Sequence, residues 1–191
     1  MGKKVHFKYG VMGSSKSLDL IRAEYNYRER GHDTFVISPA VNTRDGGQIR
    51  SRVGLSLDAV NISKEDNLFN LIRTETVKNG RNIQVIFIDE VHFLTVEQVN
   101  EVAEIADNLN IPVLCYGLKS DFRGILFPAT QRLIELADEL EEIRAVCDCD
   151  RKAMFNARFI NGKPTKSGEQ IMVGDQEYKS FCRKCYNNLW K

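Results

Sequence analysis

The chain has 191 residues, of which 42% are hydrophobic and 28% are charged, and its formal net charge is +1. This length suits one domain with at most a small appendage, and it is enough to bury a sizeable core. A near-neutral charge argues against a dedicated DNA-binding surface, which needs clustered basic residues. No apolar run approaches the roughly 18 to 20 residues of a membrane span, and no signal peptide is visible, so we expect a cytoplasmic protein.

The first predicted elements are a strand, a loop of small residues and a helix. An apolar strand over residues 5–9 leads into Gly10, and Lys16 and Ser17 follow the loop at the start of the helix. Backbone N–H groups of such a loop can bind phosphates, with the lysine neutralising phosphate oxygens and the serine hydroxyl binding magnesium. Ser15 stands where this kind of loop usually has a glycine, but serine is small enough to let the backbone approach a phosphate. An ordinary strand-to-helix turn with a solvated lysine is the alternative interpretation.

Strand and helix patterns alternate through the first three-quarters of the chain. The first helix should end near Gly31, and Thr95 with Gln98 forms a capping box at the start of a later one. We expect strands over 34–37, 85–88 and 112–116 and a loop or hairpin over 42–57. Four helices are each marked by apolar residues on one face. The first face has Leu18, Ile21 and Tyr25, the second Leu68, Leu71 and Ile72, the third Val99, Val102, Ala103, Ala106 and Leu109, and the fourth Leu133, Ala137 and Leu140. This alternation predicts an α/β fold with a mainly parallel, P-loop NTPase-type sheet flanked by helices, which binds ligands at the carboxyl ends of its strands.

Two carboxylates, Asp89 and Glu90, follow the apolar strand over residues 85–88. Ionised groups at the end of a buried strand are costly unless they are paired or bind a metal. We therefore expect Asp89 to bind magnesium and Glu90 to accept a proton from an attacking hydroxyl, a contribution of roughly 10²–10⁴ in rate. Together with the loop before Lys16, the pair predicts nucleotide-dependent phosphoryl transfer. Because ATPases use a similar glutamate to activate water, the pair alone leaves a kinase and a hydrolase both open.

The composition changes at Cys147, after which strands are short and polar and aliphatic residues are too few for folding by burial alone. Four thiolates in this part of the chain can close a tetrahedral, structural zinc site: Cys147, Cys149, Cys182 and Cys185. We therefore expect a P-loop ATP-binding α/β domain over residues 1–146 and a small zinc-binding domain over 147–191. A disulfide or an accidental clustering is the alternative. Cys115, alone in an apolar strand, is expected in the core.

A further loop, over residues 121–124, follows the strand that ends near Tyr116 and Gly117. Its aromatic residue, Phe122, is therefore expected near the edge of the sheet where ligands bind. It could stack on a planar ligand such as a base, although an aromatic residue in a loop is as often part of ordinary packing.

These residues, taken in order, resemble the zinc-containing, type II thymidine kinase family, in the branch found in enteric bacteria and their relatives. The resemblance covers essentially the whole chain, and so many motifs in the same order are far more specific than any one of them. They lie at residues 12–17, 51–55, 89–93, 112–118, 121–124, 126–127, 147–149, 151–153 and 168–170, at Tyr178 and at 182–185.

The resemblance implies transfer of the ATP γ-phosphate to the 5′-hydroxyl of thymidine or deoxyuridine, with Mg²⁺ as cofactor and a structural Zn²⁺. Glu90 is then the catalytic base, and Ser17 and Asp89 are the magnesium ligands. The ATP site comprises Tyr9, Gly10, Val11, Met12, Gly13, Ser14, Ser15, Lys16, Ser17, Asp89, Glu90, Val91 and His92. The nucleoside site comprises Met12, Asn42, Arg44, Phe93, Leu118, Phe122, Phe127, Ile171, Met172, Val173 and Tyr178.

The resemblance also implies a lasso-shaped lid loop on the zinc-binding domain, which closes over the base and binds the pyrimidine largely through backbone groups near Met172. Such a lid fits an enzyme that must exclude water from phosphoryl transfer. The family further implies feedback inhibition by dTTP and a homotetramer, with no nucleic-acid or membrane partner.

Three residues depart from the family pattern. Ser15 replaces the loop glycine, Asn42 replaces an aspartate near the sugar, and His92 replaces a glutamine after the acidic pair. An asparagine oxygen still accepts a hydrogen bond but carries no charge. These departures leave the nucleoside range and the turnover open.

Two other functions remain to be weighed against a nucleoside kinase. One is an ATPase-like P-loop domain with a zinc-ribbon appendage that binds nucleic acid, against which the near-neutral charge argues. The other is a P-loop ATPase that hydrolyses ATP without any nucleoside.

Overall fold

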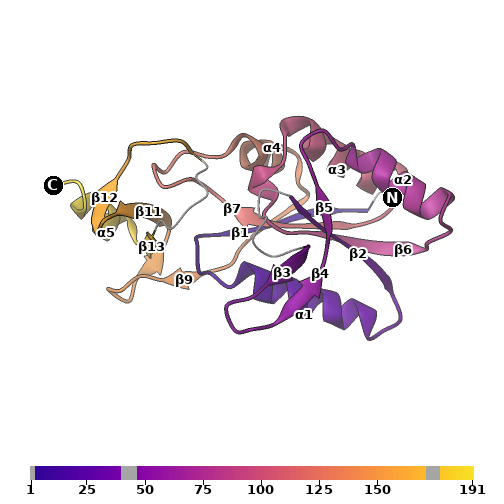
Figure 1. Ribbon diagram of the computed structural model, residues 1–191, viewed down its shortest axis with the longest axis horizontal. Coiled ribbons are helices and arrows are strands. Elements are labelled where there is room, and N and C mark those ends of the chain that lie inside the picture. Colours follow the sequence, from indigo (N-terminus) through magenta and orange to yellow (C-terminus); the bar gives the residue numbers. More distant parts are fainter. Residues whose placement is uncertain (1–2, 40–46, 171–176) are drawn as a thin grey trace.

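A computed structural model describes residues 3–39, 47–170 and 177–191 of the chain, and a six-stranded sheet runs through its larger part (Figure 1). The strand order is β5-β2-β6-β7-β1-β8, and every neighbouring pair is parallel. The strands are β1 (Val5–Gly10), β2 (Asp33–Pro39), β5 (Val60–Ile62), β6 (Ile83–Ile88), β7 (Val113–Leu118) and β8 (Glu139–Glu142). The predicted α/β fold with a parallel sheet is confirmed.

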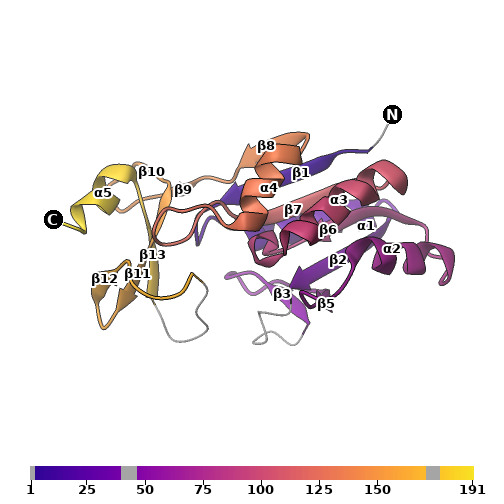
Figure 2. The same ribbon diagram turned by 90° about the horizontal axis from the view of Figure 1, so that it is seen from above.

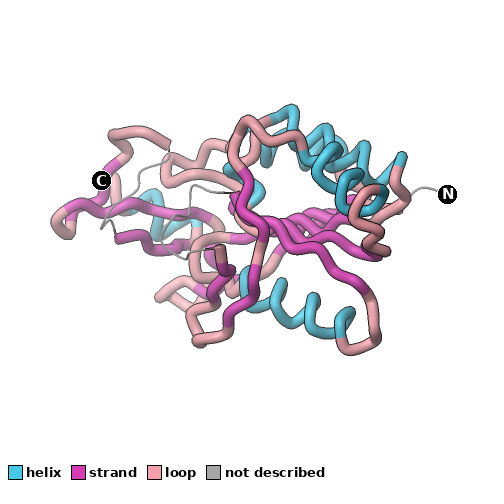
Figure 3. The backbone as a smooth tube through the Cα atoms, turned by 45° about the vertical axis from the view of Figure 1, so that its right-hand side comes forward, coloured by secondary structure: helices cyan, strands magenta, loops and turns pink. Residues whose placement is uncertain are grey.

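Helices cover both faces of this sheet, as Figures 1 and 3 show. One face packs against α1 (Lys16–Arg28), and the other against α2 (Leu68–Val77), α3 (Val96–Asn108) and α4 (Pro128–Leu136), while a short 3₁₀ turn, η2 (Val91–Phe93), follows the acidic pair. The described part of the chain has no helix that is both long and apolar enough to cross a membrane.

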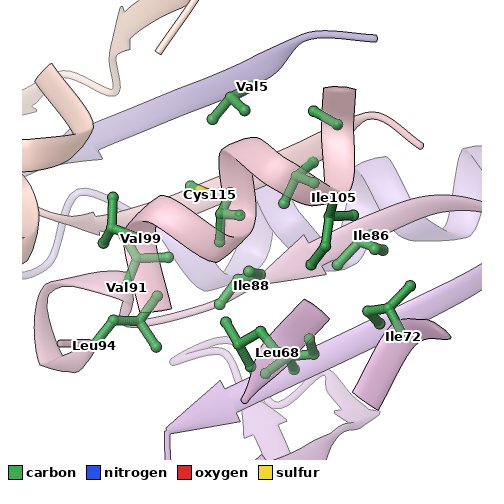
Figure 4. Close-up of a cluster of buried hydrophobic side chains, with 14 of the residues drawn as sticks. Val5, Leu68, Ile72, Ile86, Ile88, Val91, Leu94, Val99, Ile105 and Cys115 are labelled. Atoms are coloured by element: carbon green, nitrogen blue, oxygen red, sulfur yellow. The ribbon is translucent and has the colours of Figure 1, made fainter. Parts of the chain in front are cut away.

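Alternate residues of β6 enter two separate apolar cores. Ile86 and Ile88 join the cluster that packs under α2 and α3 (Figure 4), whereas Val85 and Phe87 join the cluster under α1. All four side chains are fully buried, as expected for a central parallel strand covered on both faces. This burial fixes the end of β6, and with it Asp89, which a hydrogen bond from Ser17 connects to the start of α1.

The expected helix start at Thr95 is confirmed in detail. Thr95 Oγ1 accepts the Gln98 N–H at 3.1 Å, and Gln98 Oε1 accepts the Thr95 N–H at 3.1 Å, which completes a capping box at the start of α3. The predicted loop or hairpin after β2 is a hairpin in its described part, formed by β3 (Gln48–Arg50) and β4 (Ser56–Asp58).

The prediction of which residues form the buried face of α1 is partly wrong. Ile21 is buried as expected, but Tyr25 is 49% exposed, and the inward stripe runs through Lys16, Leu20 and Glu24. Glu24 is tolerated there because its carboxylate accepts a hydrogen bond from Thr34 Oγ1 at 2.8 Å. Periodicity of apolar residues misses a stripe that contains two charged side chains.

The last predicted helix of the larger part is too long. It ends at Leu136, and Leu140 lies instead in the edge strand β8, where it pairs with Phe7. Asp138 explains the change, because its backbone N–H donates to the Val5 carbonyl at 2.9 Å and its carboxylate accepts the Val5 N–H at 2.7 Å. A tertiary contact with β1 therefore ends the helix.

The C-terminal part forms a smaller unit at one end of the molecule (Figure 2). It comprises β9 (Ala145–Val146), β10 (Lys152–Ala153), β11 (Phe155–Ile160), β12 (Lys163–Thr165), β13 (Glu177–Phe181) and α5 (Arg183–Asn188). β11 and β12 are joined by Asn161 and Gly162, whose φ angles of 50° and 75° are typical of a two-residue hairpin turn. This unit has its own small core, which Val11 of the larger part joins. The division of the chain at residue 146 stays a prediction.

Candidate active site

The loop between β1 and α1 makes a tight turn that requires glycine at its start. A Cβ atom on Gly10 would lie 2.7 Å from the Ile143 carbonyl oxygen and 2.3 Å from Ser14 Oγ. At the other end of the loop, Ser15 adopts a left-handed conformation with φ of 63°. That conformation costs a non-glycine residue roughly 1–2 kcal/mol, which explains why glycine is usual at this place.

Lys16, the first residue of α1, turns its side chain back to this loop and is 7% exposed. Its Nζ donates to the Val11 carbonyl at 2.9 Å, which leaves two of its three donors for a ligand. Burial lowers the pKa of Lys16, and the negative charges of Glu90 and Asp89 oppose that shift. An ammonium group in this position can bind a polyphosphate that enters the loop.

A hydrogen bond between Ser17 and Asp89 links the start of α1 to the end of β6. Ser17 Oγ donates to Asp89 Oδ2 at 2.9 Å, and the Glu90 N–H donates to Asp89 Oδ1 at 3.0 Å. Burial raises the pKa of Asp89, while the bonds from Ser17 and Glu90 oppose the rise. The loop from Gly10 to Ser17 is called the phosphate loop below, after its predicted ligand. A hydroxyl and a carboxylate at hydrogen-bond distance beside this loop fit a Mg²⁺ site, because magnesium prefers few protein oxygens together with substrate phosphates.

Glu90 follows in a strained backbone conformation and faces a cavity. Its φ angle is 49°, a left-handed value that is uncommon for glutamate, and its side chain is 28% exposed. Burial raises the pKa of Glu90 to about 7, with a further rise from the charge of Asp89 and an opposing effect of Lys16. A carboxylate with such a pKa is suited to general base chemistry near neutral pH.

His92 is buried and supports the turn that carries Glu90. Its Nδ1 accepts the Leu118 N–H at 3.2 Å and lies 3.4 Å from Glu90 Oε2. Burial lowers the pKa of His92 well below its ordinary value, so the ring is neutral and carries its proton on Nε2. Gly117 makes the close contact feasible, because a Cβ atom there would lie 2.8 Å from a Val91 methyl group.

A cavity of about 360 Å³ lies in front of these groups. Its polar side is formed by the loop, with Lys16, Ser17 and Glu90, and its apolar side by Phe93, Leu118, Phe122 and Phe127. The rings of Phe93 and Phe127 lie 6.5 Å apart in an edge arrangement, and His92 packs against both. The cavity therefore joins a phosphate-binding side to a wall that suits a planar base.

Most predicted site residues are brought together by the fold. The cavity lining includes Met12, Gly13, Ser15, Lys16, Ser17, Glu90, His92, Phe93, Leu118, Phe122, Phe127 and Tyr178. The cavity lining does not include six others, of which Val11, Val91 and Tyr9 pack in or against apolar cores: Tyr9, Gly10, Val11, Ser14, Asp89 and Val91. Asn42, Arg44, Ile171, Met172 and Val173 lie outside the described residues.

Phe122 is held from behind by Arg158, which motif reasoning missed. The Arg158 guanidinium carbon lies 3.6 Å from the Phe122 ring centroid, and the side chain is fully buried. Its Nε donates to the Tyr178 hydroxyl at 2.8 Å, and another nitrogen donates to the Glu169 carbonyl at 2.9 Å. One arginine thus fixes two aromatic residues of the cavity wall at once.

Asp121 fixes the loop that carries Phe122. Its buried carboxylate accepts the N–H groups of Arg123 and Ile125 at 2.8 and 3.0 Å, and it pairs with the Arg123 guanidinium. Its second oxygen also accepts from Gln170 Nε2 at 3.2 Å, which ties this loop to the C-terminal unit.

The C-terminal unit also contacts the phosphate loop directly. Asn156 Oδ1 accepts the Met12 N–H at 2.8 Å, and Ser180 Oγ donates to the Met12 carbonyl at 2.6 Å. Asn156 Nδ2 donates in turn to the Ser120 carbonyl at 3.2 Å. The two units therefore share the polar framework around Met12.

The four cysteines of the C-terminal unit form one cluster. All four sulfur atoms lie within 4.8 Å of one another, and Cys149 Sγ lies 3.5–3.6 Å from each of the other three. A tetrahedral zinc ion with Zn–S bonds of about 2.3 Å requires sulfur atoms roughly 3.8 Å apart, so the cluster fits zinc. All five cysteines of the chain are free, so the alternative of a disulfide is not supported.

Comparison with known proteins matches the chain to one family over almost its whole length. The family model described as "TK: Thymidine kinase" covers residues 3–186. The thymidine kinase of Francisella tularensis subsp. tularensis is 40% identical over 189 residues, 95% of each chain. That of Enterobacteria phage T4 is 40% identical over 187 residues, 97% of this chain and 96% of its own. That of Legionella pneumophila subsp. pneumophila is 45% identical over 186 residues, 96% of this chain and 88% of its own.

The chain belongs to the thymidine kinase family.

Membership of the thymidine kinase family confirms the resemblance that the motifs indicated, and it does not favour the alternative of an ATPase with a nucleic-acid-binding appendage. The cavity also contains residues that motif reasoning did not single out as site residues: Leu18, Arg50, Ser51, Arg52, Val53, Asp121, Asn156 and Gln170. The segments 51–55, 121–124 and 168–170 contribute to the resemblance, which was the available signal for five of them. No comparable signal marked Leu18, Arg50 or Asn156.

Proposed function

We propose that this protein is a thymidine kinase, which transfers the γ-phosphoryl group of ATP to the 5′-hydroxyl of thymidine or deoxyuridine and yields the 5′-monophosphate. One observation carries the proposal: the Glu90 carboxylate, the Lys16 ammonium and the aromatic wall around Phe122 line the same cavity. A base, a phosphate-binding group and a surface for a nucleobase are what this reaction needs in one place.

Each part of the site then has its own role in the reaction. The loop around Gly13 and Lys16 binds the ATP polyphosphate, and Mg²⁺ bound near Ser17 and Asp89 supplies neutralisation of its negative charge. Glu90 accepts the proton of the 5′-hydroxyl, and its raised pKa, about 7, matches that role near neutral pH. Phe122 and Phe127 hold the pyrimidine against the apolar wall and exclude water.

The nucleoside is further held by residues that the family resemblance assigns. Met12, Phe93, Leu118 and Tyr178 line the cavity beside Phe122. We also assign to this site the residues outside the described ranges, which are Asn42 and Arg44 near the sugar and Ile171, Met172 and Val173 at the pyrimidine. Zinc bound by the four cysteines would support the C-terminal unit, to which residues 171–173 belong in sequence.

Three broader properties are part of the proposal. We infer a homotetramer and feedback inhibition by dTTP, because the family resemblance implies both properties. A cytoplasmic location agrees with the free cysteine thiols, since thiols stay reduced in that compartment. Size-exclusion chromatography with light scattering tests the assembly, with about four times the chain mass of 21.8 kDa expected.

The decisive experiment incubates the protein with Mg-ATP and a panel of nucleosides and detects the 5′-monophosphate products. We expect thymidine and deoxyuridine to be phosphorylated and purine nucleosides to be inert. Release of ADP is measured with and without thymidine in parallel. Equal ADP release in both would identify a hydrolase and overturn the proposal.

A further inference from the structure

The loop that carries Phe122 is held partly by its own hydrogen bonds and partly by one from the C-terminal unit. Within the loop, the Gly124 N–H donates to the Asp121 carbonyl at 3.1 Å, and the Asp121 N–H donates to the Ile125 carbonyl at 2.8 Å. The Phe122 carbonyl accepts a hydrogen bond from the hydroxyl of Tyr186 at 2.7 Å. Phe122 and Tyr186 are only 2% and 4% exposed, so water has little access to either partner of this bond.

The Tyr186 ring is fixed by its neighbours in the C-terminal unit. It stacks on the Phe155 ring, with the centroids 4.9 Å apart and an angle of 21° between the planes. The Trp190 ring meets it edge-on at 5.6 Å, and Lys166 Nζ lies 5.4 Å from its centroid. A ring packed in this way keeps one orientation, so its hydroxyl has a defined place.

Phe155 contacts the same loop at a second point. A Cβ atom on Gly124 would lie 3.5 Å from each of two ring carbons of Phe155. Gly124 has a φ angle of 82°, which a glycine adopts without strain. The loop therefore meets the C-terminal unit through a hydrogen bond at Phe122 and through van der Waals contact at Gly124.

The position of Tyr186 depends in turn on the cysteine cluster. Tyr186 lies on α5 directly after Cys185, and its N–H donates to the Cys182 carbonyl at 2.9 Å. Cys182 Sγ also accepts the Cys185 N–H at 3.5 Å. The first turn of α5, which carries two of the four clustered cysteines, thus sets where the tyrosine hydroxyl lies.

We propose that Tyr186 is a positioning residue for nucleoside binding, whose hydroxyl fixes the backbone of Phe122 and so holds the Phe122 ring in place for the base. The proposal rests on the thymidine kinase function proposed above. Arg158 stacks behind the ring, whereas Tyr186 holds the backbone that carries it. Without the hydroxyl, the buried Phe122 carbonyl loses its partner, and the loop can regain one only by moving.

The test compares Tyr186→Phe with the wild-type enzyme, since phenylalanine keeps the stacked ring and removes only the hydroxyl. Tyr25→Phe is the matched control, because it also loses a hydroxyl that donates a hydrogen bond, to Glu29 at 2.6 Å, on a ring that is 49% exposed and does not line the cavity. We expect Tyr186→Phe to raise the thymidine Kd and KM about tenfold, with kcat and the ATP KM changed less than about threefold. Metal analysis should find the same zinc content in all three proteins.

Two further readouts separate positioning from a general loss of structure. Amide hydrogen exchange over residues 121–125 should become faster in Tyr186→Phe, while β11 and β13 exchange as in the wild type. In a Phe122→Ala background, Tyr186→Phe should change the thymidine Kd less than about twofold, because both changes act on the same ring.

An unchanged thymidine Kd in Tyr186→Phe, or losses that multiply in the double variant, would overturn the role of Tyr186. Loss of zinc from Tyr186→Phe would assign the effect to the cysteine cluster and would also overturn it. A wild-type enzyme that produces no thymidine monophosphate, while residues 121–125 still exchange faster in Tyr186→Phe, would instead overturn the function on which the proposal rests.

Discussion

At the scale of single residues, Glu90 combines two properties that a general base needs. Its side chain reaches the cavity, at 28% exposed, and its pKa is raised to about 7, first by burial and then by the charge of Asp89. His92 packs beside it as a neutral ring whose Nδ1 already accepts the Leu118 N–H. The η2 turn thus positions the Glu90 carboxylate, and the neutral His92 ring beside it does not form an ion pair with it.

Replacement of Glu90 by glutamine tests the base directly. Glutamine keeps the shape of the side chain but cannot accept the 5′-hydroxyl proton. We expect Glu90→Gln to lower kcat by roughly 10²–10⁴ while the thymidine dissociation constant changes less than about threefold. Steady-state kinetics and calorimetric titration with thymidine measure the two quantities. A variant with wild-type kcat would remove Glu90 from this role.

The pH dependence of the reaction follows from the same residue. Because the pKa of Glu90 is raised to about 7, the carboxyl group is protonated and inactive below that pH and becomes able to accept a proton above it. We expect kcat/KM for thymidine to rise about tenfold per pH unit up to pH ~7 and then to level off, since this ratio reports the free enzyme. A profile that stays flat between about pH 5.5 and 8 would contradict the assignment.

At the scale of elements, the cavity wall depends on contacts between β11, β13 and the loop before α4. Arg158 on β11 stacks on Phe122 of that loop at 3.6 Å and donates to the hydroxyl of Tyr178 on β13 at 2.8 Å. Its guanidinium is fully buried, so these partners are fixed with little freedom. A single side chain therefore sets how three elements meet at the nucleoside side of the cavity.

Replacement of Arg158 by lysine tests this arrangement. A lysine keeps the charge but cannot hold the Tyr178 hydroxyl and the Glu169 carbonyl in one plane, and hydrogen bonds to charged groups contribute about 1.5–3 kcal/mol. We expect the thymidine KM to rise tenfold or more and the ATP KM to change less than about threefold. Arg132→Lys is the control, because Arg132 bonds Asn100 of α3 and Glu135 of α4 and does not line the cavity. Unchanged thymidine KM in Arg158→Lys would show that the wall forms without it.

At the scale of the whole molecule, two units with different means of support meet at one cavity. The larger one has extensive apolar clusters on both faces of its sheet, whereas the C-terminal unit has a small core beside four clustered sulfur atoms. Asn156 and Ser180 of that unit hold Met12 of the phosphate loop. The same unit also holds the aromatic wall through Arg158 and Tyr178, whereas Lys16 and the Ser17–Asp89 pair lie in the larger unit. Loss of order in the C-terminal unit should therefore affect the nucleoside side most and the ATP side less.

Removal of the metal tests this dependence. A bound zinc ion supplies folding free energy that a small core lacks, so chelation should loosen the residues after Cys147. We expect thymidine binding to be lost and ATP binding to fall only a few-fold, with both restored when zinc is added back. Metal analysis and calorimetric titration with each ligand provide the measurements. Intact thymidine affinity in a zinc-free sample would contradict the expectation.

Much of the fold and part of the site could be predicted from the sequence because their signals are local. The buried run over residues 85–88, the small-residue loop before Lys16 and the capping box at Thr95 each depend on neighbouring residues along the chain. The closely spaced cysteine pairs predict the four-sulfur cluster, which fits zinc, for the same reason. These patterns, with the family motifs, determined the parallel α/β fold, the phosphate loop, the acidic pair and the reaction class.

Only the tertiary structure decided which distant side chains complete the cavity. Arg52 reaches it because two short strands pair as a hairpin, Arg158 because β11 lies behind Phe122, and Asn156 because its amide matches the Met12 backbone. The early end of α4 has the same origin, since Asp138 bonds to the backbone of Val5. Contacts between residues far apart in the chain, such as Met12 and Asn156 at a separation of 144 positions, depend on the packing of whole elements, and local sequence periodicity does not encode them.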